Sequence, residues 1–403
     1  MTDASITAGK LRSARSVTEP FAIKLPSLVE VGGGVSERLP EHLQVLGARR
    51  VLVVTDTFLN EHGPVSAIVA RLEEAGIATA VFHEVQPDPT TINVRDGLEA
   101  LHRHGAEAVV AVGGGSPIDA AKAVAVMAGR DGSIADYAGY DRIGGKGLPL
   151  VAIPTTAGSG SEQTRATVIA DTERNVKLAI YDDALLPVVA LVDYRLSLTQ
   201  PRELTAHVGL DALVHAVEAY VSRRATPVSD ALAVEAARMV WSNLRTAFGT
   251  PDAEPARAAV MLGASLAGAA FSNSSVCLVH GMSRPIGANF HIAHGLANAL
   301  LFSTVTRFGL ESSGGRYAEL ARAIGLADET AGDDEANAAL IESLDSLVAA
   351  LEIPTMPDLG VSETDYEAAL AEMADAALAS GSPAFNPRQP TKQEIIELYR
   401  EAY

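Results

Sequence analysis

The 403-residue sequence is poor in cysteine, tryptophan and positive charge. Its single cysteine excludes an intrachain disulfide and any zinc or redox site built on paired cysteines. Its 31 Lys and Arg residues are outnumbered by 50 Asp and Glu residues, so the formal net charge is −19. A surface of that sign repels phosphate backbones and anionic lipids, which disfavours nucleic acids and membrane surfaces as partners.

Long apolar runs are missing as well. No stretch approaches the roughly 18 apolar residues of a membrane-spanning helix, and the first residues contain no apolar segment typical of a secretory signal. Residues 1–20 are polar and rich in Ser, Thr and Ala, and we expect a flexible arm there. The expected protein is globular and cytoplasmic, and its length allows two or three domains with an ordinary apolar core.

The first half of the chain alternates short β-branched runs with segments of helix length. The runs cover residues 50–56, 78–85, 107–113, 149–155 and 187–193. Continuous apolar runs of this kind are typical of parallel strands that are buried on both faces. Residues 21–196 are therefore predicted to form a doubly wound, Rossmann-like α/β domain.

The pattern changes after about residue 197. Strand-like runs disappear, and long segments rich in Ala, Leu and Glu follow with apolar residues at helical spacing. Three segments carry helix-start residues, namely Ser229-Asp230, Ser362 with Asp365, and Thr391 with Glu394. Residues 197–403 are predicted to form an all-helical domain.

Two turns at predicted strand ends suit a nucleotide. EAVVAVGGGSPIDAAKAVAV (107–126) passes from a strand into a helix, which we expect to begin near Pro117, through a turn made of Gly113, Gly114, Gly115 and Ser116. Glycines let the backbone approach a ligand, and the N–H groups of a helix start suit a pyrophosphate. The spacing is not GxGxxG, so a tight turn without a ligand stays an alternative. PTTAGSGSE (154–162) is a second such turn, and two of them mark the crevice where open α/β sheets bind ligands.

Asp56 ends the predicted strand over residues 50–56. A carboxylate at that place can accept hydrogen bonds from the ribose hydroxyls of adenosine and would repel a 2′-phosphate, which favours NAD over NADP. The alternative is a helix N-cap.

A candidate metal site lies in the second half. GLDALVHAVEAYVS (209–222) places Asp211 and His215 four residues apart, on one face of a helix. VHGMSRPIGANFHIAHG (279–295) adds His280, His291 and His294. Carboxylate and neutral imidazole suit Fe(II), Zn(II) or Mn(II), although any one of these histidines could instead be an ordinary core residue.

In one straight helix, His280 and His294 would lie about 21 Å apart and could not share an ion. Pro285 and Gly287 stand between them and allow the chain to break and turn back, which makes a site shared by these histidines feasible.

Taken together, these motifs resemble the iron-containing (group III) alcohol dehydrogenases. GGGSPIDAAKA, PTTAGSGSE, GLDALVHAVEAYVS, FSNSSVCLVHGMSRPIG and HIAHGLANALL occur in the order of that family, over nearly the whole chain from Phe21. The resemblance implies the two-domain architecture also found in dehydroquinate synthase, with an active site in the cleft between the domains. It further implies NAD(H), Fe(II) with Zn(II) as an alternative, a small alcohol or aldehyde as substrate, and a homodimer or larger homo-oligomer.

The resemblance also assigns roles by motif. It implies metal ligands at Asp211, His215, His280 and His294. It implies cofactor contacts at Asp56, Gly113, Gly114, Gly115, Ser116, Asp119, Thr155, Thr156, Ser159 and Lys177, with Lys122 in the helix behind. Phe271, nine residues before His280, matches a position of the pocket wall that limits substrate size.

One position departs from the family pattern. Many members have HGMAHPIG, in which the second histidine is thought to relay a proton, whereas this chain has Arg284 there. A guanidinium stays protonated and cannot act as an acid–base relay. The proton would instead pass through metal-bound water, the ribose hydroxyl of the nicotinamide or His291.

Arg284 also raises a question about the substrate. A divalent ion with one Asp and three neutral His has a charge of about +1, and an inward arginine would bring it to about +2, which is costly in a dry site. Our hypothesis is a small aldehyde or alcohol that carries a carboxylate, sulfonate or phosphonate held by Arg284. In the alternative, Arg284 faces the cofactor phosphates, a surface carboxylate or another subunit, and the substrate is an ordinary short-chain alcohol.

Other functions within this architecture stay open. They are polyol oxidation, as in glycerol dehydrogenase, and the non-redox chemistry of dehydroquinate synthase. A nucleotide-binding protein without catalysis is disfavoured, because all four candidate ligands are present.

Overall fold

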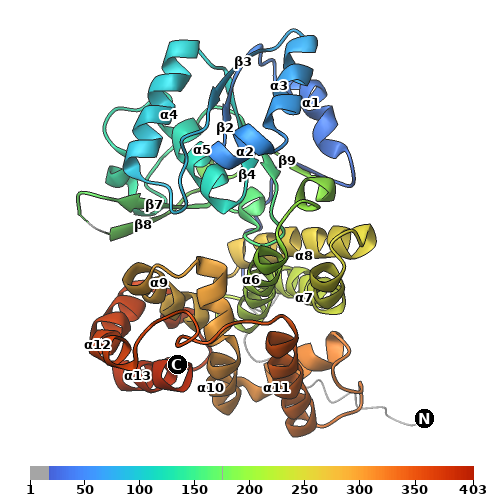
Figure 1. Ribbon diagram of the computed structural model, residues 1–403, viewed down its shortest axis with the longest axis vertical. Coiled ribbons are helices and arrows are strands. Elements are labelled where there is room, and N and C mark those ends of the chain that lie inside the picture. Colours follow the sequence, from blue (N-terminus) through green and yellow to red (C-terminus); the bar gives the residue numbers. More distant parts are fainter. Residues whose placement is uncertain (1–17, 175) are drawn as a thin grey trace.

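The computed structural model describes residues 18–174 and 176–403, so residues 1–17 of the expected arm lie outside it. Its N-terminal half is an α/β domain and its C-terminal half is helical (Figure 1). Both parts of the predicted fold class are thereby confirmed. None of the helices in the described residues has the length and apolar character needed to cross a membrane.

The described part of the α/β half contains a parallel sheet in the order β1-β9-β6-β4-β2-β3. The strands are β1 (Leu28–Val31), β2 (Arg50–Val54), β3 (Ala78–Phe82), β4 (Ala108–Gly113), β6 (Leu150–Pro154) and β9 (Val189–Val192). All five predicted runs are strands of this sheet. Because β2 and β4 are neighbours while the chain runs outward from β2 to β3, the sheet has its topological switch point between β2 and β4.

Strand β2 shows why the sheet is covered on both faces. Val51 and Val53 point to one face and pack against residues of α1 and α3, whereas Leu52 and Val54 point to the other and pack against α4 and α5. These helices are α1 (Leu39–Val45), α3 (Val65–Glu74), α4 (Thr91–His104) and α5 (Gly115–Met127), and the short α2 (Thr57–His62) follows β2. The alternation explains the continuous apolar runs of the sequence.

A second, smaller sheet was not predicted. It has the order β5-β8-β7, with β5 (Gly139–Tyr140), β7 (Ala166–Asp171) and β8 (Val176–Tyr181). Strands β7 and β8 pair antiparallel, and β5 adds to β8 in parallel. This sheet lies at the edge of the α/β half that faces helix α9 (Figure 1).

The second half consists of helices around one apolar core. They are α6 (Arg202–Val221), α7 (Pro227–Gly249), α8 (Glu254–Ser272), α9 (Leu278–Phe290), α10 (His294–Ala323), α11 (Asp333–Ala350), α12 (Glu363–Ala379) and α13 (Lys392–Glu401). The predicted starts at Ser362 and Thr391 are confirmed, since both residues are N-caps. The start expected at Ser229-Asp230 is wrong, because Thr226 forms a capping box with Ser229 and α7 already begins at Pro227.

Where Gly158 and Gly160 of the α/β half contact the helical half, the packing leaves no room for a side chain on either glycine. A methyl group on Gly160, in the turn after β6, would lie 2.6 Å from the Cα of Gly268 in α8. A methyl group on Gly158 would collide with Val208 of α6. We call this contact of Gly158 and Gly160 with α6 and α8 the glycine join.

Candidate active site

A cavity of about 1050 Å³ lies between the two halves and is lined by residues of both. One wall belongs to the strand ends of the α/β half, including Gly114, Gly115 and Ser116. The other belongs to the helical half and includes Asp211 and His280. The motifs that the sequence places far apart thus share one cavity.

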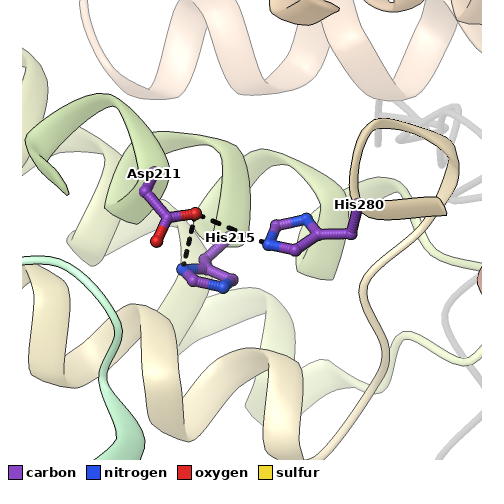
Figure 2. A group of neighbouring side chains, drawn as sticks. All are labelled: Asp211, His215 and His280. Carbon is purple, nitrogen blue, oxygen red and sulfur yellow. Dashed lines mark ion pairs between the residues drawn. The ribbon is translucent and has the colours of Figure 1, made fainter. Parts of the chain in front are cut away.

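The helical wall begins with α6, where Asp211 and His215 project from one face. The Oδ1 atom of Asp211 lies 3.8 Å from Nδ1 of His215 and 3.6 Å from Nε2 of His280, which comes from α9 (Figure 2). Nε2 of His294, the first residue of α10, lies 3.9 Å from the same carboxylate oxygen. Asp211, His215 and His280 thus form one buried group that could hold a metal ion, with ligand atoms within 4.8 Å of one another, and the half-exposed His294 lies at its edge.

The chain reaches this arrangement differently from expectation. Helix α9 continues through Pro285 to Phe290, so the break that Pro285 and Gly287 would allow does not occur there. The chain instead turns at His291, which adopts the left-handed conformation at φ 55° and ends α9. Gly287 still has a role, because a methyl group there would lie 3.1 Å from the carbonyl oxygen of Ile292 as the chain returns.

The protein environment shifts the pKa values of these side chains. Burial lowers the pKa of His215 to about 3, so this imidazole is neutral at neutral pH. Burial also acts to lower the pKa of His280, but the carboxylates of Glu218 and Asp211 outweigh it and raise that pKa above its usual value. Burial alone would raise the pKa of Asp211, but the neighbouring imidazoles hold it far below its usual range. Nδ1 of His215 is buried and has no hydrogen-bond partner among the described residues. One carboxylate and imidazole nitrogens gathered around it fit a divalent transition metal.

Glu218 orients His280 and was missed in the sequence. Its Oε2 accepts hydrogen bonds from Nδ1 of His280 at 2.7 Å and from the backbone N–H of Cys277 at 2.7 Å, and its Oε1 accepts from the N–H of Val279 at 2.6 Å. Nε2 of His280 is thereby directed at Asp211. The spacing in the sequence could have indicated this role, because Glu218 lies seven residues after Asp211, on the same helix face.

Asn298 is a second residue that the sequence analysis missed. Its Nδ2 donates to Oδ1 of Asp211 at 2.6 Å and lies 3.2 Å from Nε2 of His280 and 3.3 Å from Nε2 of His294. It stands four residues after His294, one turn further along α10. This amide contacts the same three atoms that would bind an ion.

The opposite wall is the glycine turn between β4 and α5. Gly113 has a φ of 155°, and a methyl group there would lie 2.5 Å from Cγ of Pro117. Gly114 is the N-cap and α5 starts at Gly115, two residues before the expected start at Pro117. The first N–H groups of α5 lack partners within the helix and face the cavity, as a bound pyrophosphate requires.

The other predicted cofactor residues surround this turn. Thr155, Thr156 and Ser159 follow β6 and line the cavity. Lys177 also lines it and pairs with Asp88 at 2.7 Å.

Asp119 and Lys122 brace the turn from behind. Oδ1 of Asp119 accepts from Oγ of Ser161 at 2.6 Å, and Nζ of Lys122 donates to Oγ1 of Thr164 at 2.7 Å. Lys122 is fully buried, and burial lowers its pKa to about 8. These contacts hold α5 against the segment that follows β6.

Asp56 is a helix N-cap and also lines the cavity. It lies at the switch point and caps α2, where its Oδ1 accepts from the N–H of Leu59 at 2.8 Å. The N-cap alternative is therefore correct as local structure, and it leaves the carboxylate beside the cavity.

The chain matches two family models over nearly its whole length. Residues 26–194 match the model described as "Iron-containing alcohol dehydrogenase". Residues 205–403 match the model described as "Fe-containing alcohol dehydrogenase family, C-terminal". The chain belongs to this family.

Known relatives agree with this assignment. The chain is 37% identical to 1,3-propanediol dehydrogenase of Citrobacter freundii, over 95% of this chain and 99% of the relative. A crystal structure of 1,3-propanediol oxidoreductase has a TM-score of 0.92 at 36% identity, covering 96% of this chain and all of the other. The sulfoacetaldehyde reductase of Bifidobacterium kashiwanohense in complex with NAD+ has a TM-score of 0.85 at 28% identity, covering 95% and 99% of the chains. The protein is thus an alcohol dehydrogenase or aldehyde reductase of the iron-containing family.

The three residues expected nearest the substrate have different places in this dehydrogenase. Phe271 lines the cavity and stacks on His215, with ring centroids 4.4 Å apart. Arg284 lines the cavity as well. His291 is exposed and is not among the residues that line the cavity in the described part of the chain. The geometry therefore does not favour the proton-relay role expected for His291.

Proposed function

We propose that this dehydrogenase uses NAD(H) and a divalent metal ion to interconvert a small primary alcohol and its aldehyde. The observation that carries the proposal is that two walls share one cavity. Asp211, His215, His280 and His294 converge on the helical wall, and the glycine turn at the start of α5 forms the other.

In this proposal each wall holds one group. Asp211, His215, His280 and His294 would bind the metal, and Gly114, Gly115, Ser116, Thr156 and Ser159 would hold the dinucleotide. When bound, the metal polarises the substrate oxygen and the nicotinamide gives or takes the hydride. The tight fit of the turn supports the dinucleotide, since a methyl group on Gly114 would lie 3.1 Å from Oγ1 of Thr156 and narrow the groove.

The residues of the chain supply selectivity. Asp56, beside the switch point, would accept hydrogen bonds from the adenosine ribose and would repel a 2′-phosphate, so NAD is preferred to NADP. Phe271 covers one side of His215 and leaves space for a short substrate. Iron is the proposed metal, with zinc as the alternative that the same ligands accept.

Arg284 bears on the substrate class. It follows His280 by one turn of α9 and lines the same cavity, where we propose that it contacts an acidic group of the substrate. The similar structure named as a sulfoacetaldehyde reductase supports this proposal, because its named substrate carries a sulfonate.

The proposal is tested with purified enzyme stripped of metal and reloaded without oxygen. Separate samples receive Fe(II) or Zn(II), and each is assayed with NADH and NADPH on short aldehydes by the absorbance of the reduced nicotinamide. We expect turnover that requires metal and is faster with NADH. Metal-independent turnover, or tight NADH binding without turnover on any aldehyde or alcohol, would overturn it.

A further inference from the structure

Four Lys and Arg side chains line the cavity, and they differ in their partners. Arg165 pairs with Asp141 and Asp183, and Lys177 pairs with Asp88. Arg224 and Arg284 line the same cavity without a carboxylate in ion-pair distance anywhere in residues 18–174 and 176–403. In a chain with 50 acidic residues against 31 basic ones, two half-buried guanidinium groups without a carboxylate partner offer a place for an anion.

Both arginines lie at the helical side of the cavity. Arg284 stands one helical turn after His280 on α9 and lines the cavity together with His280 and His294. Arg224 follows the end of α6, with its guanidinium 5.1 Å from the ring of Phe385.

Tyr140 lines the same cavity as the two arginines. It belongs to β5 and stacks on Tyr181 with ring centroids 4.6 Å apart. Burial and the neighbouring Tyr181 raise the pKa of Tyr140, while the charges of Arg224, Arg284 and Arg165 act in the opposite direction. The hydroxyl of Tyr140 is thus a polar group on the lining that Arg224 and Arg284 share.

We propose that Arg224, Arg284 and Tyr140 form one subsite that binds the acidic group of the substrate. The inference rests on the proposed function, to which it adds Arg224 and Tyr140 as specificity-determining residues. Two guanidinium groups can donate several charge-assisted hydrogen bonds to a carboxylate, sulfonate or phosphonate, and the tyrosine hydroxyl adds a neutral donor. The ligand is a short aldehyde or alcohol with its acidic group at the end away from the reacting carbon.

A phosphate group of the cofactor is the other possible source of the anion. The glycine turn that would hold the pyrophosphate lies on the opposite wall, at the start of α5, whereas Arg284 stands on α9 one helical turn after His280. The arrangement favours the substrate, and the experiment separates the two sources.

The test compares sulfoacetaldehyde with methylsulfonylacetaldehyde, in which a methyl group replaces the charged oxygen at nearly equal size. The measured quantity is the ratio of kcat/KM for the anionic over the neutral aldehyde, in the wild type and in Arg224→Gln, Arg284→Gln and Tyr140→Phe. Arg223→Gln is the matched control, because Arg223 is exposed, adjacent to Arg224 and absent from the cavity lining of the described residues.

We expect each Arg→Gln change to lower this ratio by about 10-fold or more, and Tyr140→Phe to lower it by about 3-fold. Arg223→Gln should leave it unchanged. Binding of ethanesulfonate to the enzyme–NADH complex, measured by calorimetry, should weaken in parallel, which gives a readout independent of turnover.

Three outcomes would overturn the inference. The ratio could stay constant in all variants, the control could change it equally, or the affinity for NADH could fall as much as the ratio does, which would assign the arginines to the cofactor. A wild type that turns over the neutral aldehyde but not the anionic one would also overturn it while leaving the proposed function intact. Failure of the proposed function itself looks different, because neither aldehyde would then be reduced.

Discussion

The two walls of the cavity are built on different principles. The α/β wall uses backbone: Gly113, Gly114 and Gly115 bring helix N–H groups to the cavity, and the signal for this lies within a few consecutive residues. The helical wall uses side chains from α6, α9 and α10, which meet only because three helices pack together. If the proposed function is correct, substitutions on the α/β wall should mainly lower the affinity for the cofactor and the stability of the fold. Substitutions on the helical wall should mainly lower the metal content and the rate of the reaction.

The largest expected effect comes from the helical wall. Asp211→Asn keeps the size of the side chain but removes the charge around which three histidines are arranged. We expect loss of bound metal and a fall in kcat/KM of about 1000-fold, equivalent to about 4 kcal/mol, with little change in melting temperature. Metal analysis and kinetics measure this, with the exposed Glu203→Gln on the same helix as control. Full metal content in Asp211→Asn would contradict the ligand assignment.

A smaller effect is expected at Glu218, which contacts a proposed metal ligand but is not itself one. Glu218→Gln replaces the acceptor of Nδ1 of His280 by an amide and leaves the four proposed ligands in place. We expect metal affinity to fall by about 10- to 100-fold, measured by competition with a chelator. Glu203→Gln again serves as control, and Glu218→Asp should recover part of the affinity if the carboxylate acts by orienting the ring. An unchanged affinity in Glu218→Gln would show that α9 alone fixes this histidine.

The smallest of these effects is expected on the glycine wall. Gly113→Ala places a methyl group 2.5 Å from Pro117 at a φ of 155°. We expect a loss of about 1–3 kcal/mol in the free energy of unfolding together with weaker NADH binding. The metal content should stay at the wild-type level, which would sharpen the contrast between the walls. Gly129→Ala is the control, since no atom lies within 4 Å of a methyl group there. Equal losses in both variants would mean that the turn has no special strain.

What could be predicted from the sequence follows the same division. The strands of the large sheet were found because runs such as β2 and β4 are apolar on both faces. Strand β1 was missed because it has only four residues, stands at the edge of the sheet and is partly exposed. The small sheet was missed although β7 alternates between buried and half-buried residues, a pattern typical of a strand covered on one face.

On the helical wall, the sequence identified the ligand candidates but not the path between them. A proline within a helix usually ends it, yet Pro285 lies inside α9 and the turn occurs at His291, where no local signal demands it. Arg224 and Tyr140 could not be predicted as site residues. They come from the end of α6 and from a two-residue strand, and only the packing of the two halves brings them to one cavity.

The glycine join limits which halves of two related enzymes can be combined in one chimaeric chain. Because Gly160 and Gly268 touch through their backbones, each half has been shaped to the other at a spot where one extra carbon atom has no room. A chimaera that takes its cofactor half from one enzyme and its metal half from another must keep glycine on both sides of this contact. If it does not, the halves will be pushed apart, and the two walls of the cavity will separate with them.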